Sequence, residues 1–278
     1  MTEETSFNQR IVRYEEIHSI AQNDFDALIN AASPNTADRI LDCGSGYGAV
    51  TRELLSKVSS SQLPKASPLR IDLIDESTVQ LERAKQELKP WLNNPAFILT
   101  LIPGTFPDDL PTKSMEYDVV FSKMVLHEIP SFTQPEFVRR VYECLKKNGR
   151  FVFWDVCLSP NTAEFYRNVV RMKDHLAGYE TMVERRNFLT EHEIRNLFDL
   201  SPFAHFELVK NITYQFDTVK RLEPEFRGDR VRFEEWQTFI RASAASIGAS
   251  VLEEIHYQDD GYRIRFNVRK VIARAIRE

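Results

Sequence analysis

The amino-acid sequence predicts an α/β fold built on a doubly wound, mostly parallel sheet. Five short apolar segments, at about residues 39–43, 69–74, 97–102, 117–122 and 150–156, alternate with segments of helical periodicity. Strands and helices that alternate in this way form parallel sheets with right-handed crossovers. The fourth segment contains a continuous apolar run, which is typical of a parallel strand buried on both faces. A glycine-rich turn follows the first segment, where such sheets commonly bind a ligand.

The helices are predicted from the spacing of apolar residues between these strands. In residues 7–33 the spacing indicates two short helices, and further helices are expected over 49–58, 78–88 and 134–146. Residues 59–68 are rich in Ser, Pro and Lys and are expected to form a surface loop. The first, second and fourth strands are therefore each followed by a helix that can cross back over the sheet.

The part of the chain beyond residue 156 is less regular. Residues 161–186 are mostly helical, and 190–200 start with Thr and carry Glu three positions later, which is the pattern of a capping box. Residues 206–216 have the pattern of a strand, and 233–247 have that of a helix.

Composition excludes several classes of protein. Of the 278 residues, 42% are apolar, so a large core can be buried and global disorder is excluded. The formal net charge is −5, and no nucleic-acid partner is expected without a basic excess. The three cysteines are far apart, which argues against a disulfide framework or a zinc site, and no metal is expected. Because no signal peptide or membrane-spanning apolar segment is visible, we expect a cytoplasmic protein with no membrane partner.

The turn at residues 44–48, Gly-Ser-Gly-Tyr-Gly, is the strongest signal for a ligand. Glycines let the backbone approach a ligand without an intervening Cβ, and the following helix presents free N–H groups at its N-terminus. The glycines also fit a dinucleotide fingerprint, because Ala49 follows Gly46 at the required spacing. Two carboxylates favour another ligand. Asp42 can pair with the ammonium of a methionine moiety but would repel a pyrophosphate, and Asp75 can accept bonds from ribose hydroxyls.

With these motifs, residues 38–156 resemble the class I S-adenosylmethionine-dependent methyltransferase superfamily. The family's first motif matches Ile-Leu-Asp-Cys-Gly-Ser-Gly-Tyr-Gly at residues 40–48. Its motifs around the third, fourth and fifth strands resemble residues 104–106, 117–129 and 145–152.

The resemblance implies a Rossmann-like sheet of seven strands that closes with an antiparallel pair, and S-adenosylmethionine as the cofactor. Thr105 stands where the family often has an Asp that faces the adenine, so the backbone N–H of Phe106 is the expected contact. Tyr14, in the N-terminal segment, is expected to close over the cofactor. The residues expected to bind the cofactor are Asp42, Gly44, Ser45, Gly46, Gly48, Asp75, Glu76, Thr105, Phe106, Ser122, Lys123 and Tyr14.

Candidate catalytic residues follow the carboxyl ends of the strands or lie beyond the fifth strand. His127 could deprotonate a hydroxyl or an amine near neutral pH, and Asp155 could bind the substrate or a metal. His175 and Tyr179 share one helix face and, with Asp174, could line the substrate pocket. We therefore expect His127, Asp155 and His175 to be the catalytic residues. A purely structural role remains the alternative for each of these side chains.

Three regions are expected along the chain. Residues 1–36 form N-terminal helices that cover the cofactor site, and residues 37–156 and 233–278 form the methyltransferase core. Residues 157–232 form a mainly helical cap whose many aromatic side chains can enclose a small molecule.

The closing antiparallel pair is assigned to residues 251–258 and 262–272. These segments are joined by Asp-Asp-Gly, which is a hairpin signal. A rival assignment places the last helix of the core at 190–200 and the sixth strand at 206–216. This assignment moves the cap boundary but keeps the same core.

The hypothesis is that the protein transfers a methyl group from S-adenosylmethionine to O, N or C of a small-molecule acceptor, such as a secondary metabolite. One alternative is a protein that binds the same cofactor but is non-catalytic or non-methylating. A weaker alternative is an NAD-dependent oxidoreductase. A homodimer is left open.

Overall fold

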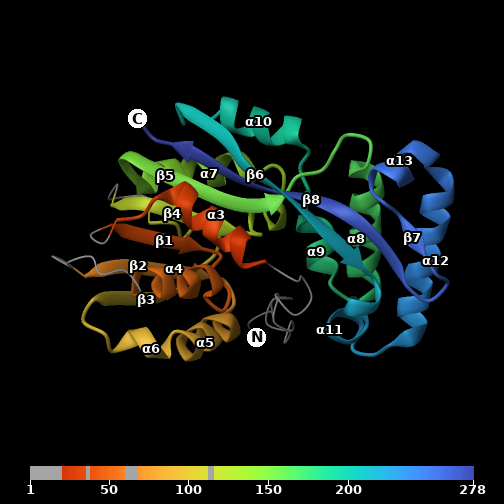
Figure 1. Cartoon of the computed structure of the whole chain (residues 1–278), viewed down its shortest axis with the longest axis horizontal. Helices are drawn as coiled ribbons and strands as arrows, with labels where there is room; N and C mark the ends of the chain where they lie inside the picture. The colour runs from red at the N-terminus through yellow and green to blue at the C-terminus, as the bar shows by residue number, and fades with distance from the viewer. Residues whose placement is uncertain (1–20, 36–37, 60–67, 112–115) are drawn as a thin grey trace.

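A computed structural model describes residues 21–35, 38–59, 68–111 and 116–278 of the chain. The centre of the molecule is an eight-stranded sheet (Figure 1). Seven of its strands follow the order β3-β2-β1-β4-β5-β8-β6, and β7 pairs with β8 beside this path. The predicted fold class, a mostly parallel sheet with antiparallel C-terminal strands, is confirmed.

The five parallel strands lie where the sequence predicts them. Most of their residues are buried, because alternate side chains enter the apolar layers on the two faces of the sheet. On β4, for example, Val120 belongs to one layer, whereas Val119 and Phe121 belong to the other. The strands are β1 (Arg39–Cys43), β2 (Leu69–Asp75), β3 (Phe97–Pro103), β4 (Tyr117–Lys123) and β5 (Leu145–Val156).

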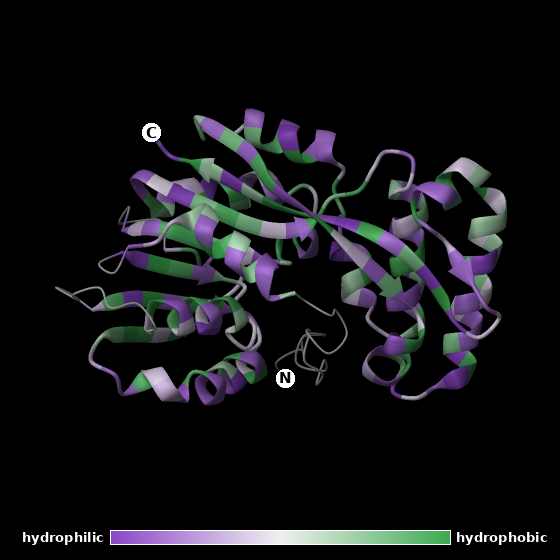
Figure 2. Ribbon diagram, viewed as in Figure 1, coloured by the Kyte–Doolittle hydropathy of each residue, from purple (hydrophilic) through white to green (hydrophobic). Residues whose placement is uncertain are grey.

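Helices cover both faces of this sheet. One layer contains apolar residues of α3 and α4, and the other contains those of α7 and α10, so the sheet is sandwiched between helices (Figure 1). In Figure 2 the hydrophobic residues follow the central strands, whereas hydrophilic residues dominate the outer helix α10. The helices of this part are α3 (Gln22–Ala32), α4 (Ala49–Ser59), α5 (Thr78–Glu87), α6 (Lys89–Leu92), α7 (Gln134–Cys144) and α10 (Glu191–Asp199).

The two long C-terminal strands differ from the predicted hairpin. β6 (His205–Asp217) pairs with β8 (Ile264–Ile276) along nearly its whole length, in antiparallel register. The prediction of a strand over 251–258 is wrong, because Ala249–Glu254 forms helix α13 and only β7 (Gln258–Asp259) pairs with β8. The rival assignment of a core helix near 190–200 and a strand near 206–216 matches the structure. Long-range pairing of two long strands satisfies far more backbone groups than the short hairpin can.

The cap helices come from two segments, 157–189 and 218–263, on either side of β6, whereas a single insertion over 157–232 is predicted from the sequence. β6 and β8 extend from the sheet into this cap and contribute residues to its apolar core (Figure 1). The cap helices are α8 (Ala163–Leu176), α9 (Glu180–Arg185), α11 (Leu222–Phe226), α12 (Arg230–Ser246) and α13, with the short 3-10 helix η2 (Val219–Arg221).

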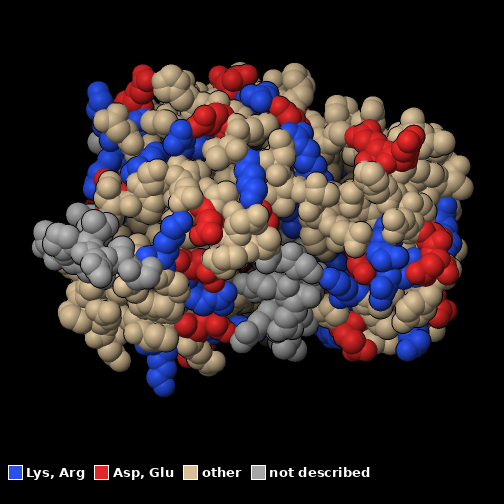
Figure 3. Space-filling model, viewed as in Figure 1, with Lys and Arg blue, Asp and Glu red and all other residues tan. Residues whose placement is uncertain are grey.

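Of the predicted N-terminal helices, the structure describes only α3, and Tyr14 lies outside the described residues. Within the described ranges, none of the helices is both long and apolar enough to cross a membrane. On the face shown in Figure 3, acidic and basic side chains are interspersed over the surface.

Candidate functional site

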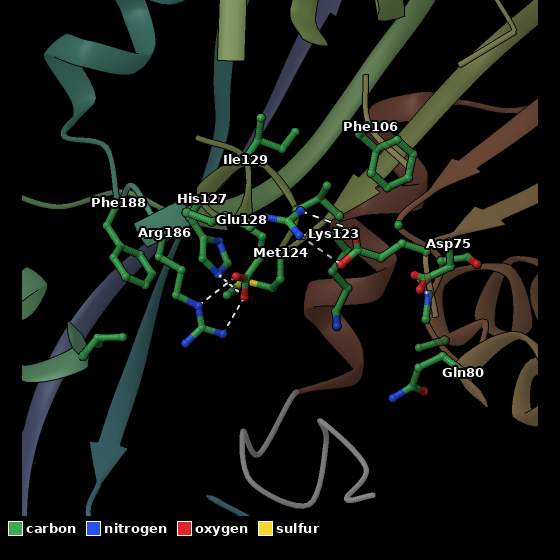
Figure 4. Close-up of a pocket in the computed structure, with 18 of the residues that line it drawn as sticks. Asp75, Gln80, Phe106, Lys123, Met124, His127, Glu128, Ile129, Arg186 and Phe188 are labelled. Atoms are coloured by element: carbon green, nitrogen blue, oxygen red, sulfur yellow. Dashed lines mark hydrogen bonds and ion pairs between the residues drawn. The ribbon is translucent and has the colours of Figure 1, made fainter. Parts of the chain in front are cut away.

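One continuous pocket runs from the glycine turn to the cap. Its first half is formed by the segments that follow β1, β2 and β3, together with the end of β4. Its second half is formed by the short 3-10 helix η1 (Leu126–Glu128) and by cap residues of α8, α11 and η2. Figure 4 shows the two ends, with Asp75 and Gln80 on one side and His127 and Phe188 on the other. The pocket lies at the carboxyl ends of the strands, where open α/β sheets bind ligands.

The glycine turn presents backbone directly to the first half of this pocket. Gly44 has φ +68°, and a Cβ added to it would lie 2.1 Å from Cγ2 of Val125, so both conformation and space require glycine. Gly46 has φ +53°, and no described atom would lie within 4 Å of a Cβ added to it. Gly48, which was also predicted to bind the cofactor, is not in the pocket wall and packs towards Leu88.

Asp42 lies at the end of β1 and is almost fully buried in the pocket wall. Its Oδ2 accepts a hydrogen bond of 2.7 Å from the Thr51 hydroxyl. Burial raises the pKa of Asp42 to about 6, which the Thr51 hydrogen bond and the charge of Lys123 oppose. A cationic group placed beside this carboxylate would favour its ionised form.

Asp75 organises the glycine turn as well as lining the pocket. Its Oδ2 accepts the backbone N–H of Gly46 at 2.8 Å, and its Oδ1 accepts that of Ser77 at 2.9 Å. Burial raises the pKa of Asp75 to about 6. The neighbouring Glu76 also lines the pocket and is paired at 3.4 Å with Arg185 of the cap.

The remaining predicted cofactor residues divide into two groups. Ser45, Phe106 and Lys123 line the pocket, and the Ser45 hydroxyl oxygen is buried with no hydrogen-bond partner in the described part of the chain. Ser122 is buried outside the pocket wall. Thr105 is exposed and donates to the Asp109 carboxylate from its backbone N–H at 2.8 Å and its hydroxyl at 3.0 Å, so it caps a loop instead of facing the pocket.

His127 and Asp155, two of the predicted catalytic residues, are in direct contact. Nδ1 of His127 lies 2.6 Å from Oδ1 of Asp155, and Nε2 lies 3.3 Å from Oε1 of Glu128. Burial lowers the pKa of His127, but the carboxylates of Asp155 and Glu128 outweigh it and raise the pKa to about 9. With both ring nitrogens engaged, His127 is held as an imidazolium and is not the free base that its position in the sequence suggests.

The charged wall continues from Glu128 into the cap. Arg186 donates to both oxygens of Glu128, from Nε at 2.8 Å and from Nη2 at 2.6 Å, and its Nη1 donates to Asp174 at 2.6 Å (Figure 4 shows the contacts with Glu128). Lys173 then pairs with Asp174 at 3.0 Å and with Glu225. All of these groups are buried or nearly so, and buried charges are tolerated only when paired in this way.

The structure does not bring His175 into the pocket. Its side chain is exposed and pairs with Glu180 at 2.9 Å, so the prediction of a catalytic role for His175 has no support from the geometry. Tyr179 is buried and lies at the start of α9, outside the pocket wall. Asp174 contributes indirectly, because it holds Arg186.

Sequence reasoning missed several residues that form this site. Glu128, Arg186, Lys173 and Arg221 line the pocket. Glu128 lies within the motif-like residues 117–129 but is not among the predicted site residues, and the other three lie outside the motifs. The sequence contains one signal: Lys173 follows the apolar Val169 and Val170 at helical spacing, which places a lysine on the buried side of the helix. A lysine in that position needs an acidic partner. The partners come from distant segments, so the pairing is visible only in three dimensions.

Comparisons with known proteins agree with this architecture. Residues 41–151 match a methyltransferase domain family. The chain is 22% identical over 175 residues to an uncharacterized methyltransferase of Oceanobacillus iheyensis, which covers 63% of this chain and 73% of that protein.

Two solved structures share the fold. The YcgJ protein of Bacillus subtilis has a TM-score of 0.69 at 15% identity, over 93% of this chain and 99% of that one. A phosphoethanolamine N-methyltransferase of Haemonchus contortus, solved with phosphomonomethylethanolamine and S-adenosylhomocysteine, has a TM-score of 0.54 at 17% identity, over 92% of this chain and 52% of that one.

These matches do not support the alternative of an NAD-dependent oxidoreductase. The matched domain begins within β1 and ends within β5, so it contains the glycine turn and the parallel strands that build the first half of the pocket. The matched residues and the shared fold therefore make this chain similar to methyltransferases.

Proposed function

We propose that this methyltransferase binds S-adenosylmethionine in the first half of the pocket and transfers its methyl group to O, N or C of a small-molecule acceptor held in the second half. The observation that carries the proposal is the continuity of the pocket, in which the glycine turn and the cap residues line one cavity. A cofactor and an acceptor that share one cavity can be placed in line, and orientation is the main contribution of a protein to such a displacement.

The residues of the first half fit the cofactor. The Ser45 hydroxyl is buried without a partner in the described ranges, and the space in front of Gly46 is open, so the turn offers a polar group and room for a ligand. Asp42 would hold the ammonium group, Asp75 and Glu76 the ribose hydroxyls, and Lys123 the carboxylate, while Phe106 would contact the adenine. When bound, S-adenosylmethionine supplies an electrophilic methyl group on a sulfonium.

The cap half would exclude water and orient the acceptor. Phe188 stacks on the His127 ring with 4.8 Å between ring centroids, and Tyr166 meets Phe188 edge-on at 5.0 Å. His127, held by Asp155 and Glu128, keeps its protons and fixes the Glu128 carboxylate in the wall. This arrangement favours acceptors whose nucleophilic atom needs no strong base, such as an amine, a carboxylate or an ionised hydroxyl.

Isothermal titration with S-adenosylmethionine, S-adenosylhomocysteine and NAD tests the cofactor assignment. We expect micromolar binding of the two sulfur ligands and none of NAD. An Asp75→Ala variant should lose the binding, whereas an Asp199→Ala variant, changed at the exposed end of α10, should keep it. Failure of the wild-type protein to bind either sulfur ligand would contradict the proposal, and the mass of the acceptor product after turnover would distinguish methylation from another reaction.

A further inference from the structure

The cap half of the pocket contains two hydrogen-bond donors that have no acceptor among the residues that the structure describes. Tyr166 on α8 lines the pocket and is only 8% exposed, and its hydroxyl makes no hydrogen bond with any residue that the structure describes. Arg221 of η2 is 5% exposed and donates from Nη1 to Glu225 and from Nη2 to the Tyr214 hydroxyl at 2.7 Å. Its Nε is buried and has no partner in the described ranges. A buried donor without an acceptor is costly, as at Nε of Arg221, and the hydroxyl of the pocket-lining Tyr166 is also unpaired among the described residues, so a ligand in this half of the pocket can supply an acceptor.

The two donors lie around a single aromatic ring. The Arg221 guanidinium carbon lies 4.7 Å from the centre of the Phe216 ring, and the Tyr166 ring meets the same ring edge-on at 6.2 Å. Burial raises the pKa of Tyr166 above its usual range, and the nearby Arg221 charge only partly opposes this, so the phenol keeps its proton. Both groups therefore offer protons to the same region at neutral pH.

The other charged groups of the cap half are already engaged. Arg186 makes three hydrogen bonds to carboxylates, and Lys173 is paired with two acids. They serve as a neutral, ion-paired wall. Apolar side chains form the rest of the surface, among them Met124, Val170 and Phe188. The polar end of the acceptor is thus expected to meet Tyr166 and Arg221, and its body is expected to meet the apolar side chains.

We propose, on the basis of the function proposed above, that Tyr166 and Arg221 anchor the acceptor, and that the acceptor is an apolar molecule whose far end carries a carboxylate. A carboxylate supplies the acceptor atoms that both donors lack, and hydrogen bonds between charged groups are the strongest of their kind. A guanidinium suits a carboxylate by its planar shape and its permanent charge. An ammonium group at the same place would leave both donors without an acceptor, because it can only donate.

The test uses the full chain with saturating S-adenosylhomocysteine and three matched probes. These are 3-phenylpropanoate, 3-phenylpropanamide and 3-phenylpropylamine, titrated calorimetrically into the wild-type protein and into Tyr166→Phe, Arg221→Lys and Tyr262→Phe variants. Tyr166→Phe removes only the hydroxyl, and Tyr262→Phe makes the same change at a residue that is 57% exposed and outside the pocket. Affinity for S-adenosylhomocysteine, measured first, shows that each variant is folded.

The carboxylate should bind best and the amine worst. In Tyr166→Phe the carboxylate should bind about tenfold more weakly, as expected for the loss of one hydrogen bond to a charged group. The same variant should lose less affinity for the amide. Arg221→Lys should also weaken binding of the carboxylate, and Tyr262→Phe should leave the affinity for all three probes unchanged. Three outcomes would overturn the anchor without affecting the proposed function. They are equal affinity for the amine and the carboxylate, an unchanged carboxylate affinity in Tyr166→Phe, and no saturable binding of any probe to protein that does bind S-adenosylhomocysteine. Failure to bind S-adenosylhomocysteine would instead overturn the proposed function, and the anchor with it.

Discussion

Nδ1 of His127 lies 2.6 Å from Oδ1 of Asp155, and both side chains are buried. His127 follows β4, and Asp155 lies near the end of the neighbouring parallel strand β5. Their contact is therefore a direct result of the strand order. Asp155 is held in turn by the backbone N–H of Val156 at 2.7 Å. The contact fixes the protonation state of His127 and, through Nε2, the position of Glu128.

Replacing Asp155 by Asn should lower the pKa of His127. The pKa of His127 in the folded protein is about 9, above the ordinary value of 6.5. Burial lowers this pKa, but the carboxylates of Asp155 and Glu128 raise it by more. Without Asp155, burial should dominate and His127 should become neutral near pH 7.5. A titration of the imidazole signals by NMR checks this, with His127→Gln to assign the resonance. An unchanged titration curve in Asp155→Asn would show that Glu128 alone sets the protonation state.

The same contact should make stability depend on pH. Because the folded pKa of His127 is raised from 6.5 to about 9, its contribution is fully present below about pH 6.5 and is lost as the pH rises through 9. The full contribution is about 3 kcal/mol from the size of this shift. Urea unfolding of wild type and Asp155→Asn at pH 6, 7.5 and 9 measures it. The difference in free energy of unfolding between the two proteins should shrink with increasing pH, and a constant difference would contradict the assignment.

Cofactor affinity should rise between pH 5 and pH 7. Burial raises the pKa of Asp42 to about 6, and only the ionised carboxylate can pair with an ammonium group. The ionised fraction then increases about tenfold over this range, so affinity for S-adenosylhomocysteine should increase by a similar factor. Calorimetric titrations from pH 5 to pH 8 test this. Asp42→Asn should bind more weakly and with a smaller pH dependence, because only Asp75 still titrates in this range.

The two glycines of the turn should respond differently to alanine. Gly44→Ala places a Cβ 2.1 Å from Val125 Cγ2 at a φ of +68°, so it should lower the free energy of unfolding by more than about 2 kcal/mol. Gly46→Ala meets open space and has only the strain of its positive φ, about 1 kcal/mol, but it should weaken cofactor binding because it lines the pocket. Thermal unfolding and calorimetry separate the two effects. Val125→Ala should partly rescue Gly44→Ala and should not rescue Gly46→Ala.

The Arg186–Glu128 pair should be important for stability. Both side chains are nearly buried, so Arg186→Gln leaves Glu128 and Asp174 without their shared cation and should cost about 3–5 kcal/mol. Arg139→Gln breaks two partly exposed pairs, with Glu136 and Glu143 on α7, and should cost less than about 1 kcal/mol. Chemical denaturation of both variants provides the comparison. Equal and small losses would mean that the buried network contributes no more than a surface ion pair.

The first half of the site was predictable because its signals are local. Glycines in a strand–helix turn, an acid before them and an acid at the end of the next strand lie close to one another by chain geometry alone. Asp42, Gly44, Ser45, Gly46 and Asp75 accordingly line the pocket as expected. Thr105 does not, because it donates hydrogen bonds to the nearby Asp109, and Gly48 instead faces Leu88.

The pairing of the last strands was not predictable from local pattern. The Asp-Asp-Gly turn suggested a hairpin over 251–258 and 262–272, but a turn signal does not fix which long strand lies beside another. β6 and β8 form far more backbone hydrogen bonds with one another than β7 and β8 do, and this decides the outcome.

By itself, the sequence determined the parallel α/β core and the half of the pocket around the glycine turn, because periodicity and turn chemistry act between near neighbours. The tertiary structure alone decided the other half. It brought Glu128, Arg186 and Arg221 together from three separate segments and turned His127 from an expected base into a paired cation. Buried charges must find partners wherever the fold places them, and neither the partner nor the resulting pKa can be read from residues that are distant along the chain.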